Sequence, residues 1–334
     1  MALGIGLIGC GRAAERLHLP ALVRTEQARL VAVADPRPER RELAAAAGDG
    51  CNRHATPEAL LADARVSAVI LATPPETHVP LALLCLRAGK PVLIEKPLAR
   101  TPAEVRPLEA LHACSPLPLM LGFNRRFWEP VRRLRQTVRE RHAGEALRAR
   151  LVMTTDMDTW SPVGGAHDAL EDLGSHQLDL LRYVLDRPIE RVAARGNPDG
   201  SIELRVGLAN ASAECRLLQG GTPRESIAVR GVARAYEVHL GSEHLYPAAG
   251  PRRALLDLSD GLRRQWSGRP SSLRDSYRLQ LLEFLRGVTS GTQPRPGLAD
   301  GVAAVRAVAA ARDSIAGGGR EIEVARDRGT GAGA

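Results

Sequence analysis

A short apolar segment that runs directly into two glycines constrains this chain more than any other feature. Residues 3–9 read LGIGLIG, which has the length and composition of a buried strand, and an apolar helical pattern follows from Leu17 to Val23. The junction has G-x-G-x-x-A spacing, in which the first glycine permits a tight turn and the second lets the backbone approach a pyrophosphate. The start of the helix adds amides and a positive dipole end. We therefore predict a dinucleotide-binding turn built from Gly9, Gly11, Arg12, Ala13 and Ala14.

The same alternation of strand and helix continues to residue 122. Further apolar strands are expected at 30–34, 68–72, 91–94 and 117–122, and helices at 39–47 and 79–88. Continuous apolar strands that alternate with helices are typical of a parallel sheet covered by helices on both faces. The sequence thus predicts an α/β fold, with a doubly wound dinucleotide-binding domain over residues 1–122.

The pattern changes after residue 122. A basic amphipathic helix is expected at 130–141, followed by a strand at 146–154 and a helix that begins near Glu171. Alternating segments predict antiparallel strands at 202–208, 211–217, 226–232 and 236–240, and helices are expected at 272–287 and 298–316. These elements predict an α+β domain over residues 123–326 with an open, largely antiparallel sheet, whose last helix can pack back on the first domain. Residues 327–334 are expected to form a disordered tail.

The composition argues against several classes of partner. The net charge is +8 at pH 7, but the arginines are scattered among acids and form no basic stripe with aromatic residues, which argues against nucleic acid. No apolar run approaches the roughly 18 residues of a membrane span. The five cysteines are odd in number and lack metal-ligand spacing. They fit the reduced thiols of a cytoplasmic protein.

Asp35 follows the second predicted strand, where a carboxylate can accept hydrogen bonds from an adenosine ribose. The same carboxylate would repel a 2′-phosphate, so this position favours NAD. Arg37 stands two residues later and keeps NADP open as an alternative, because a nearby arginine can hold that phosphate.

Lys96 is one of only two lysines among 46 basic residues. It lies in Glu95-Lys96-Pro97, directly after a predicted strand, at the sheet edge where open α/β sheets bind ligands. Arginine cannot replace a side chain that must release and regain a proton, since its pKa stays above about 12. A lysine beside the nicotinamide would therefore suit proton transfer. A surface lysine paired with an acid explains the residue equally well, and a composition that disfavours lysine explains the scarcity.

Asp172 and His176 are four residues apart and fall on the same side of a predicted helix. Histidine titrates near neutrality, and a carboxylate one turn away can orient it for acid–base chemistry. The alternative is an acid that balances the helix dipole beside a surface histidine. No third ligand stands at a useful spacing, so we predict no metal site.

Together these segments resemble the Gfo/Idh/MocA family of sugar and polyol dehydrogenases. The resemblance rests on GIGLIGCGRAA near the start, ATPPETH at 72–78, AGKPVLIEKPLA at 88–99, GFNRRF at 122–127, the glycine pair at 164–165 and DLGSHQLDLL at 172–181. It implies a Rossmann domain followed by a substrate-binding domain. The open sheet of that second domain often forms the oligomer interface, so a homodimer or homotetramer through this sheet is expected.

The resemblance also implies roles for single residues. Lys96 matches the lysine that contacts substrate and cofactor, His176 the general acid/base, and Asp172 the aspartate that orients the histidine or holds substrate. Cofactor contacts are implied at Thr73, Pro74, His78 and Glu95, and substrate contacts at Asn124 and Arg126. The loop at 155–162 does not identify a subgroup of the family, and its Asp158 and Trp160 are further candidates for substrate binding.

The predicted activity is reversible hydride transfer between NAD, with NADP as the alternative, and a secondary alcohol of a sugar, inositol or nucleotide-sugar. His176 would exchange the hydroxyl proton while Lys96 stabilises the alkoxide. Two alternatives remain open: a glycoside hydrolase that oxidises its substrate transiently with bound NAD, and a non-catalytic regulator that binds the cofactor. Net formation of NADH separates the predicted dehydrogenase from the glycoside hydrolase, and the presence of Lys96, Asp172 and His176 argues against the regulator.

Overall fold

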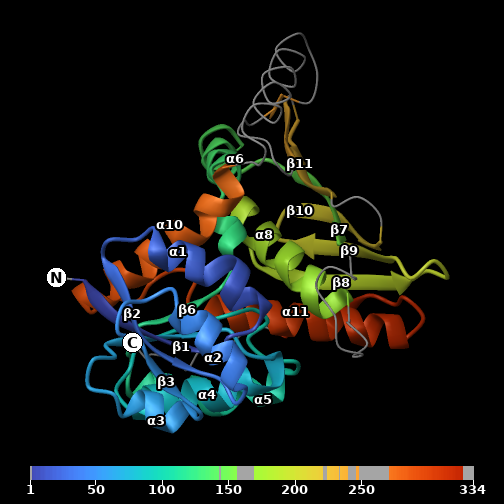
Figure 1. The fold of residues 1–334 in the computed structure, drawn as a ribbon. Coiled ribbons are helices and arrows are strands. Elements are labelled where there is room, and N and C mark those ends of the chain that lie inside the picture. The colour runs from blue at the N-terminus through green and yellow to red at the C-terminus, as the bar shows by residue number, and fades with distance from the viewer. Residues whose placement is uncertain are drawn as a thin grey trace, which may run out of the picture. The chain divides into compact units, whose positions relative to one another are not determined.

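The computed structural model describes residues 2–142, 144–155, 169–220, 224–232, 234–239, 246–247 and 271–325 (Figure 1). The predictions for Asp158, Trp160, the glycine pair at 164–165 and the tail lie outside these residues. The chain divides into two compact units, of which the first contains Met1–Glu129 and Arg269–Val305 and the second Pro130–Gly268 and Arg306–Ala334. The division into domains at residue 122 stays a prediction.

The first unit is built on a six-stranded sheet in the order β3-β2-β1-β4-β5-β6, and all neighbouring strands are parallel. Its strands are β1 (Leu3–Ile8), β2 (Ala28–Ala34), β3 (Asn52–His54), β4 (Ala68–Leu71), β5 (Val92–Ile94) and β6 (Leu119–Leu121). Every predicted strand of this region is confirmed. The edge strand β3 is additional, and its three polar residues carry no apolar pattern that could reveal it.

Helices cover both faces of this sheet. Buried residues of α1 (Leu19–Val23), α2 (Pro38–Ala45) and α10 (Ser271–Ser290) form one core with Ile5, Leu7 and Ile70. Buried residues of α3 (Pro57–Leu61), α4 (Pro75–Arg87), α5 (Pro102–Cys114) and the first turns of α11 (Leu298–Ala316) form the other with Val69 and Leu71. Alternate residues of one strand thus enter opposite cores, which confirms the predicted doubly wound fold.

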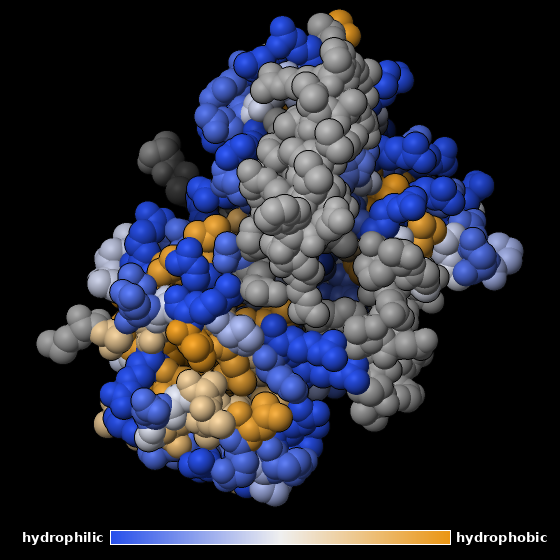
Figure 2. Space-filling view, turned by 45° about the horizontal axis from the view of Figure 1, so that its top comes forward, coloured by the Kyte–Doolittle hydropathy of each residue, from blue (hydrophilic) through white to orange (hydrophobic). Residues whose placement is uncertain are grey.

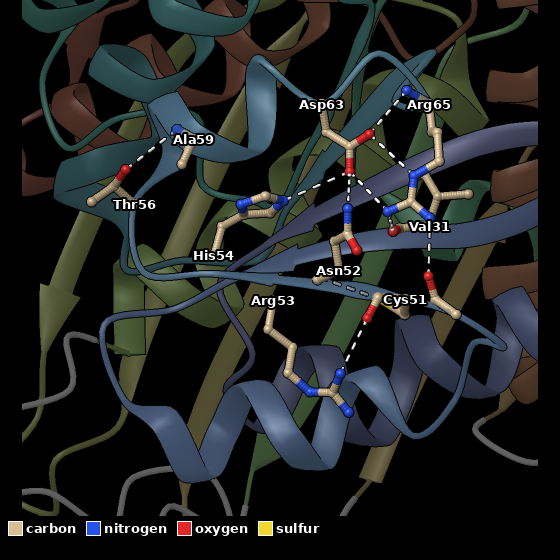
Figure 3. Close-up of polar contacts among 10 residues, drawn as sticks. Val31, Cys51, Asn52, Arg53, His54, Thr56, Ala59, Asp63 and Arg65 are labelled. Atoms are coloured by element: carbon tan, nitrogen blue, oxygen red, sulfur yellow. Dashed lines mark hydrogen bonds and ion pairs between the residues drawn. The ribbon is translucent and has the colours of Figure 1, made fainter.

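A network around Asp63 ties the edge strand β3 to the loop after α3 (Figure 3). The carboxylate of Asp63 accepts hydrogen bonds from Asn52 Nδ2 at 2.8 Å, Arg65 Nη2 at 2.9 Å and the Arg65 amide at 3.0 Å. Nε2 of His54 lies 3.7 Å from Asp63 Oδ2. Arg65 also donates to the carbonyl oxygens of Gly50 and Val31, each at 3.0 Å. A strand of three residues is therefore held at its side chains as well as by its single neighbour, β2.

The second unit contains an eight-stranded sheet in the order β13-β12-β11-β7-β10-β9-β8-β14. Its strands are β7 (Leu147–Thr155), β8 (Ile189–Gly196), β9 (Ile202–Leu208), β10 (Ala211–Gln219), β11 (Arg224–Arg230), β12 (Ala235–His239), β13 (Tyr246–Pro247) and β14 (Ile322–Glu323). All neighbouring pairs are antiparallel except β7 and β10, which run parallel at the centre of the sheet. The predicted open, largely antiparallel sheet is confirmed, and the sequence pattern misses β8, β13 and β14.

The two faces of this second sheet differ. Residues alternate between buried and accessible along β7, β9, β10 and β11. The buried side packs against a helical stretch made of η3 (Leu170–Gly174) and α8 (Ser175–Leu185). Helix α11 is joined to β8 by a hydrogen bond of 2.8 Å, which the amide of Ala194 donates to Ser314 Oγ. The basic helix α6 (Glu129–Arg141) precedes β7 as predicted. The other side of the sheet is the more accessible one.

The surface of the described residues is predominantly hydrophilic on the face drawn in Figure 2. Over the whole surface of the described residues, the exposed large hydrophobic side chains are Val23, Leu43 and Val232. Among the helices that the structure describes, none combines the length and the apolar composition needed to cross a bilayer.

Candidate functional site

The glycine turn after β1 lies against the end of β4. Gly9 has φ of +89°, and a Cβ there would come within 2.5 Å of the Ala72 carbonyl oxygen, so only glycine fits. A Cβ on Gly11 would meet nothing within 4 Å, so the space beside this residue is open and the backbone can be approached from outside. Ala14 begins η1 (Ala14–His18) and is fully buried in the sheet core. These positions match the predicted roles of a tight turn, an approachable backbone and close helix packing.

Asp35 follows β2 and is bound to the glycine turn. Its Oδ2 accepts a hydrogen bond from the Cys10 amide at 2.9 Å, and its Oδ1 accepts from both the amide and Nε of Arg37 at 3.0 Å. Burial alone would raise the pKa of Asp35, but the hydrogen bonds from Arg37 and Cys10 and the charge of Arg37 outweigh it and hold the pKa below its usual value. The carboxylate is therefore ionised at neutral pH and fixed at the end of its strand.

The neighbouring arginines also have partners. Arg37 forms an ion pair with Asp35, Arg40 donates to Glu15 at 3.0 Å, and Arg41 donates to the Asp35 carbonyl oxygen at 2.6 Å. A 2′-phosphate at this position would meet an ionised carboxylate and an arginine whose charge that carboxylate already balances. These residues suit the free ribose hydroxyls of NAD.

The turn after β4 carries Thr73 and Pro74 and leads into α4. His78 on that helix is buried, with Nδ1 at 2.7 Å from the Pro97 carbonyl oxygen and Nε2 at 2.8 Å from the Thr73 carbonyl oxygen. Burial lowers the pKa of His78 against the opposing effect of these two carbonyls. His78 thus joins the turn after β4 to the segment after β5.

Glu95 and Lys96 follow β5 at the same carboxyl edge of the sheet. Glu95 is buried, its Oε1 accepts from His18 Nε2 at 2.7 Å, and its Oε2 accepts from the Lys96 amide at 3.2 Å. Burial would raise the pKa of Glu95, but the hydrogen bond and charge of His18 lower it below its usual value. The side chain of Lys96 is partly exposed, and the Lys96–Pro97 peptide is cis.

His18 is the residue of this site that the sequence pattern misses. It lies in η1, directly after the glycine turn, and its ring stands edge-on to Tyr277 of α10 with centroids 5.9 Å apart. A histidine inside an apolar helical pattern was the available signal. Its partner Glu95 is 77 residues away, so no local pattern connects them.

Asn124 and Arg126 lie in the short helix η2 (Asn124–Phe127) and are both buried. Asn124 Nδ2 donates to Ser276 Oγ at 3.0 Å, and Arg126 Nη2 donates to Asp300 Oδ1 at 2.9 Å. These bonds join η2 to the starts of α10 and α11 within the first unit. Contact of either side chain with substrate stays a prediction.

Asp172 and His176 belong to the second unit. Asp172 lies in η3, which is a turn of π-helix, and His176 is buried in the first turn of α8. A Cβ on Gly174 would come within 2.9 Å of Leu170 Cδ1 and 3.5 Å of Leu217 Cδ1, so the glycine of the D-x-G-x-H motif lets the helix lie close to β10. Gln177 fixes the same turn by donating to the Arg216 carbonyl oxygen at 3.1 Å. π-turns inside helices frequently occur at functional sites.

Within the described ranges, no group of three or more His, Cys, Asp or Glu side chains could hold a metal ion. The predicted substrate contacts Asp158 and Trp160 lie outside those ranges.

Comparison with known proteins gives full-length relatives. The chain is 30% identical to inositol 2-dehydrogenase 2 of Saccharopolyspora erythraea, over 95% of this chain and 94% of that protein. It is 28% identical to inositol 2-dehydrogenase of Rhizobium meliloti, over 95% and 98% of the two chains. The fold is similar to that of Lactobacillus casei scyllo-inositol dehydrogenase, solved with NAD(H) and scyllo-inositol, with a TM-score of 0.80, 17% identity and coverage of 97% and 99%.

The family model described as an oxidoreductase family with an NAD-binding Rossmann fold matches residues 3–123. These are the residues that carry the glycine turn, Asp35 and the Glu95-Lys96-Pro97 segment. The full-length relatives extend the match through the second unit. The chain therefore belongs to the Gfo/Idh/MocA family of NAD-binding oxidoreductases.

Proposed function

We propose that this oxidoreductase transfers a hydride reversibly between NAD and a secondary alcohol of an inositol-type polyol. The observation that carries the substrate class is the full-length similarity to two inositol 2-dehydrogenases, which covers at least 94% of each. The retained Lys96 and the Asp172–His176 pair support catalysis over a purely regulatory role. NAD, when bound, accepts or returns the hydride at its nicotinamide ring.

Gly9, Gly11, Arg12, Ala13 and Ala14 are proposed to receive the cofactor pyrophosphate. Asp35 would accept hydrogen bonds from the adenosine ribose, because its carboxylate is ionised and held in place by Cys10 and Arg37. Thr73, Pro74, His78 and Glu95 would line the nicotinamide end through the turns after β4 and β5. NAD is preferred over NADP because Asp35 would repel a 2′-phosphate.

Lys96 is proposed to donate a hydrogen bond to the reacting hydroxyl and to stabilise negative charge that develops on its oxygen. An ammonium group supplies both, and fixed charges aimed at a developing oxyanion are a principal source of catalysis. Arg126 and Asn124, which lie in η2, are proposed to contact the substrate.

His176 is proposed to take the hydroxyl proton in oxidation and to return it in reduction. Its burial at the start of α8 and the π-turn before it fit a side chain held in one orientation. Asp172 would orient the imidazole or bind a neighbouring substrate hydroxyl. Such proton transfer typically contributes about 10²–10⁴-fold to the rate.

The protein is also proposed to form a homodimer or homotetramer through the accessible face of the eight-stranded sheet. Glu214 on β10 stands opposite Arg205 on β9 and Arg150 on β7, and these three side chains line one hollow of that face. Opposite charges that alternate across a face can pair with the same face of a second copy turned by a twofold rotation. The five free cysteines, of which only Cys114 is exposed, support a reducing, cytoplasmic location.

Steady-state assays with NAD and NADP against a panel of inositols, other polyols and free sugars test this proposal. We expect NADH to form in proportion to polyol consumed, with the highest kcat/KM for an inositol isomer. Cleavage of glycosides without net NADH would instead identify a glycoside hydrolase. Cofactor binding without turnover on any member of the panel would contradict the proposed dehydrogenase.

A further inference from the structure

We propose that two buried histidines, His18 and His78, are positioning residues that together fix the segment carrying Lys96. The inference rests on the proposed function, because it assigns the two imidazoles to the placement of its catalytic lysine. His18 acts on the residue directly before Lys96, and His78 on the residue directly after it.

His18 holds the segment on its N-terminal side. Its Nε2 donates to Glu95 Oε1 at 2.7 Å, and the other carboxylate oxygen of Glu95 accepts the amide of Lys96 at 3.2 Å. The carboxylate of Glu95 lies close to the backbone of Gly122, which follows β6. A Cβ added to this glycine would come within 2.9 Å of Glu95 Oε2, so Glu95 has little room to move. The imidazole of His18 is itself held by the ring of Tyr277. A continuous chain of contacts therefore runs from α10 through His18 and Glu95 to the Lys96 backbone.

His78 holds the segment on its C-terminal side. Its two ring nitrogens lie 2.7 Å from the Pro97 carbonyl oxygen and 2.8 Å from the Thr73 carbonyl oxygen. The ring thus lies between the peptide after Lys96 and the turn after β4, and its N–H can donate to either carbonyl oxygen. Because His78 is only 1% exposed, water does not compete for these contacts.

The two histidines lie in the helical segments that follow β1 and β4. These two strands are neighbours at the centre of the sheet. These are the segments that start at the glycine turn and at the Thr73-Pro74 turn. Each imidazole therefore links Lys96 to a turn assigned above to the cofactor. A lysine fixed in this way keeps a constant position relative to both turns.

Stability alone gives a poor account of this arrangement. Burial of an ionised carboxylate such as Glu95 is costly unless it is paired, and apolar residues of similar volume at positions 18 and 95 would pack at least as favourably. What an apolar pair could not supply is an acceptor for the hydrogen bond that the Lys96 amide donates to the Glu95 carboxylate. The hydrogen-bonded pair of His18 and Glu95 is therefore best explained by the position that it imposes on the next residue.

The test compares His18→Leu and His78→Leu with the partial replacements His18→Gln and His78→Asn, each in the full chain. A glutamine amide can take the place of Nε2 of His18, and an asparagine amide that of Nδ1 of His78. We expect both leucine variants to lose about 100-fold in kcat, the scale of an ångström-sized misplacement. His18 is not among the proposed cofactor contacts, so His18→Leu should leave the dissociation constant for NAD, measured by calorimetry, unchanged. The amide variants should recover a large part of the loss.

His112→Gln is the matched control. His112 also bonds a backbone carbonyl of the first unit, that of Leu117 at 3.0 Å, but it lies on α5, outside the helical segments that carry His18 and His78. This variant should keep the kcat of the original protein. Equal losses in the control and in the His18 and His78 variants would overturn the proposal.

A double-mutant cycle with Lys96→Met separates positioning from general structural damage. If His18 acts through Lys96, His18→Leu should cause no further loss of kcat once Lys96 is methionine. A second loss of the same size would overturn the inference. Full activity of Lys96→Met alone would instead contradict the proposed function. Should His18→Leu fail to fold, the same cycle run with His78→Leu decides between these outcomes, because that variant should likewise cause no further loss of kcat once Lys96 is methionine.

Discussion

Asp35 is the residue whose surroundings most narrow the choice of cofactor. Its carboxylate is shared between the Cys10 amide and the Arg37 side chain, so one group both shapes the turn and balances the nearest arginine. We predict that Asp35→Ala releases Arg37 for a 2′-phosphate and removes the acceptor for the ribose. The ratio of kcat/KM for NAD to that for NADP should fall by about 10- to 100-fold, the scale of a hydrogen bond to a charged group. Steady-state kinetics with both cofactors measure this ratio.

Asp49→Ala is a suitable control for that measurement. Asp49 is an exposed acid of the same unit, and only its backbone oxygen takes part in the contact with Arg29. Its removal changes the net charge by the same amount without touching the turn. An unchanged cofactor ratio in Asp35→Ala, or the same change in both variants, would contradict the role of Asp35.

His176 gives the most direct test of the second unit. We predict that His176→Ala lowers kcat by about 10²–10⁴-fold, because the proton of the hydroxyl then has no acceptor. Binding of NAD, followed by calorimetry, should be retained since the glycine turn and Asp35 are unaltered. His239→Gln, a change in a histidine on β12 of the same unit, serves as the comparison and should keep its activity. Unimpaired turnover of His176→Ala would refute the assignment.

The site residues that can be predicted from sequence are those that belong to a local sequence pattern. Gly9, Gly11 and Asp35 follow from strand ends and short spacings, and the geometry of the turn agrees with them. His18 could not be found in this way, because its partner Glu95 is brought to it only by the parallel pairing of the sheet. The contact of His78 with Pro97 has the same origin.

At the scale of whole elements, the strongly apolar strands of the first sheet are predicted well. The missed elements are those whose sequence resembles loop. β3 is the polar tripeptide Asn52–His54, and α5 carries Pro102 at its start and Pro107 inside it. The parallel pairing of β7 with β10 was also not foreseeable, since strands 56 or more residues apart give no pairing signal. Tertiary packing, which no window of sequence contains, decides these cases.

The contribution of the Asp63 network to the stability of the edge strand β3 can be measured (Figure 3). The side chain of Asp63 is 7% exposed and binds Asn52 and Arg65 at once. We predict that Asp63→Ala lowers the free energy of unfolding by about 0.5–1.5 kcal/mol at neutral pH, because Asn52 and Arg65 are exposed and exchange the charged acceptor for water. Denaturant unfolding measures the change, and Asn52→Ala, which removes only one of these donors, should cost less.

The same network predicts a dependence on pH. The hydrogen bonds and charge of Arg65 hold the pKa of Asp63 well below its usual value. Its contribution to stability is therefore complete above the unfolded pKa of about 4 and is lost as the pH falls from there toward the folded pKa. The difference in unfolding free energy between the original protein and Asp63→Ala should shrink over that interval. A difference that stays constant would exclude ionised Asp63 as its cause.

At the scale of the molecule, the two sheets differ in how their faces are covered. Helices pack on both faces of the first sheet, whereas the second sheet keeps one accessible face that carries arginine and glutamate on neighbouring strands. Arg216 and Glu203 form a cross-strand ion pair on it at 3.2 Å. Such pairs contribute little to the stability of a single chain. We propose instead that they make this face complementary to the same face of a second copy of the chain.

Arg150 is the residue through which this interface is best tested. It stands beside Glu214 on the accessible face, so Arg150→Glu places two like charges together there and, in a symmetric dimer, does so on both copies. The original protein should have a mass in solution of two or four times 35.8 kDa, as measured by sedimentation or light scattering, and Arg150→Glu should shift it toward the monomer. Arg139→Glu, an exposed change on α6, should leave the mass unaltered. A monomeric original protein, or a variant of undiminished mass, would rule out this face as the interface.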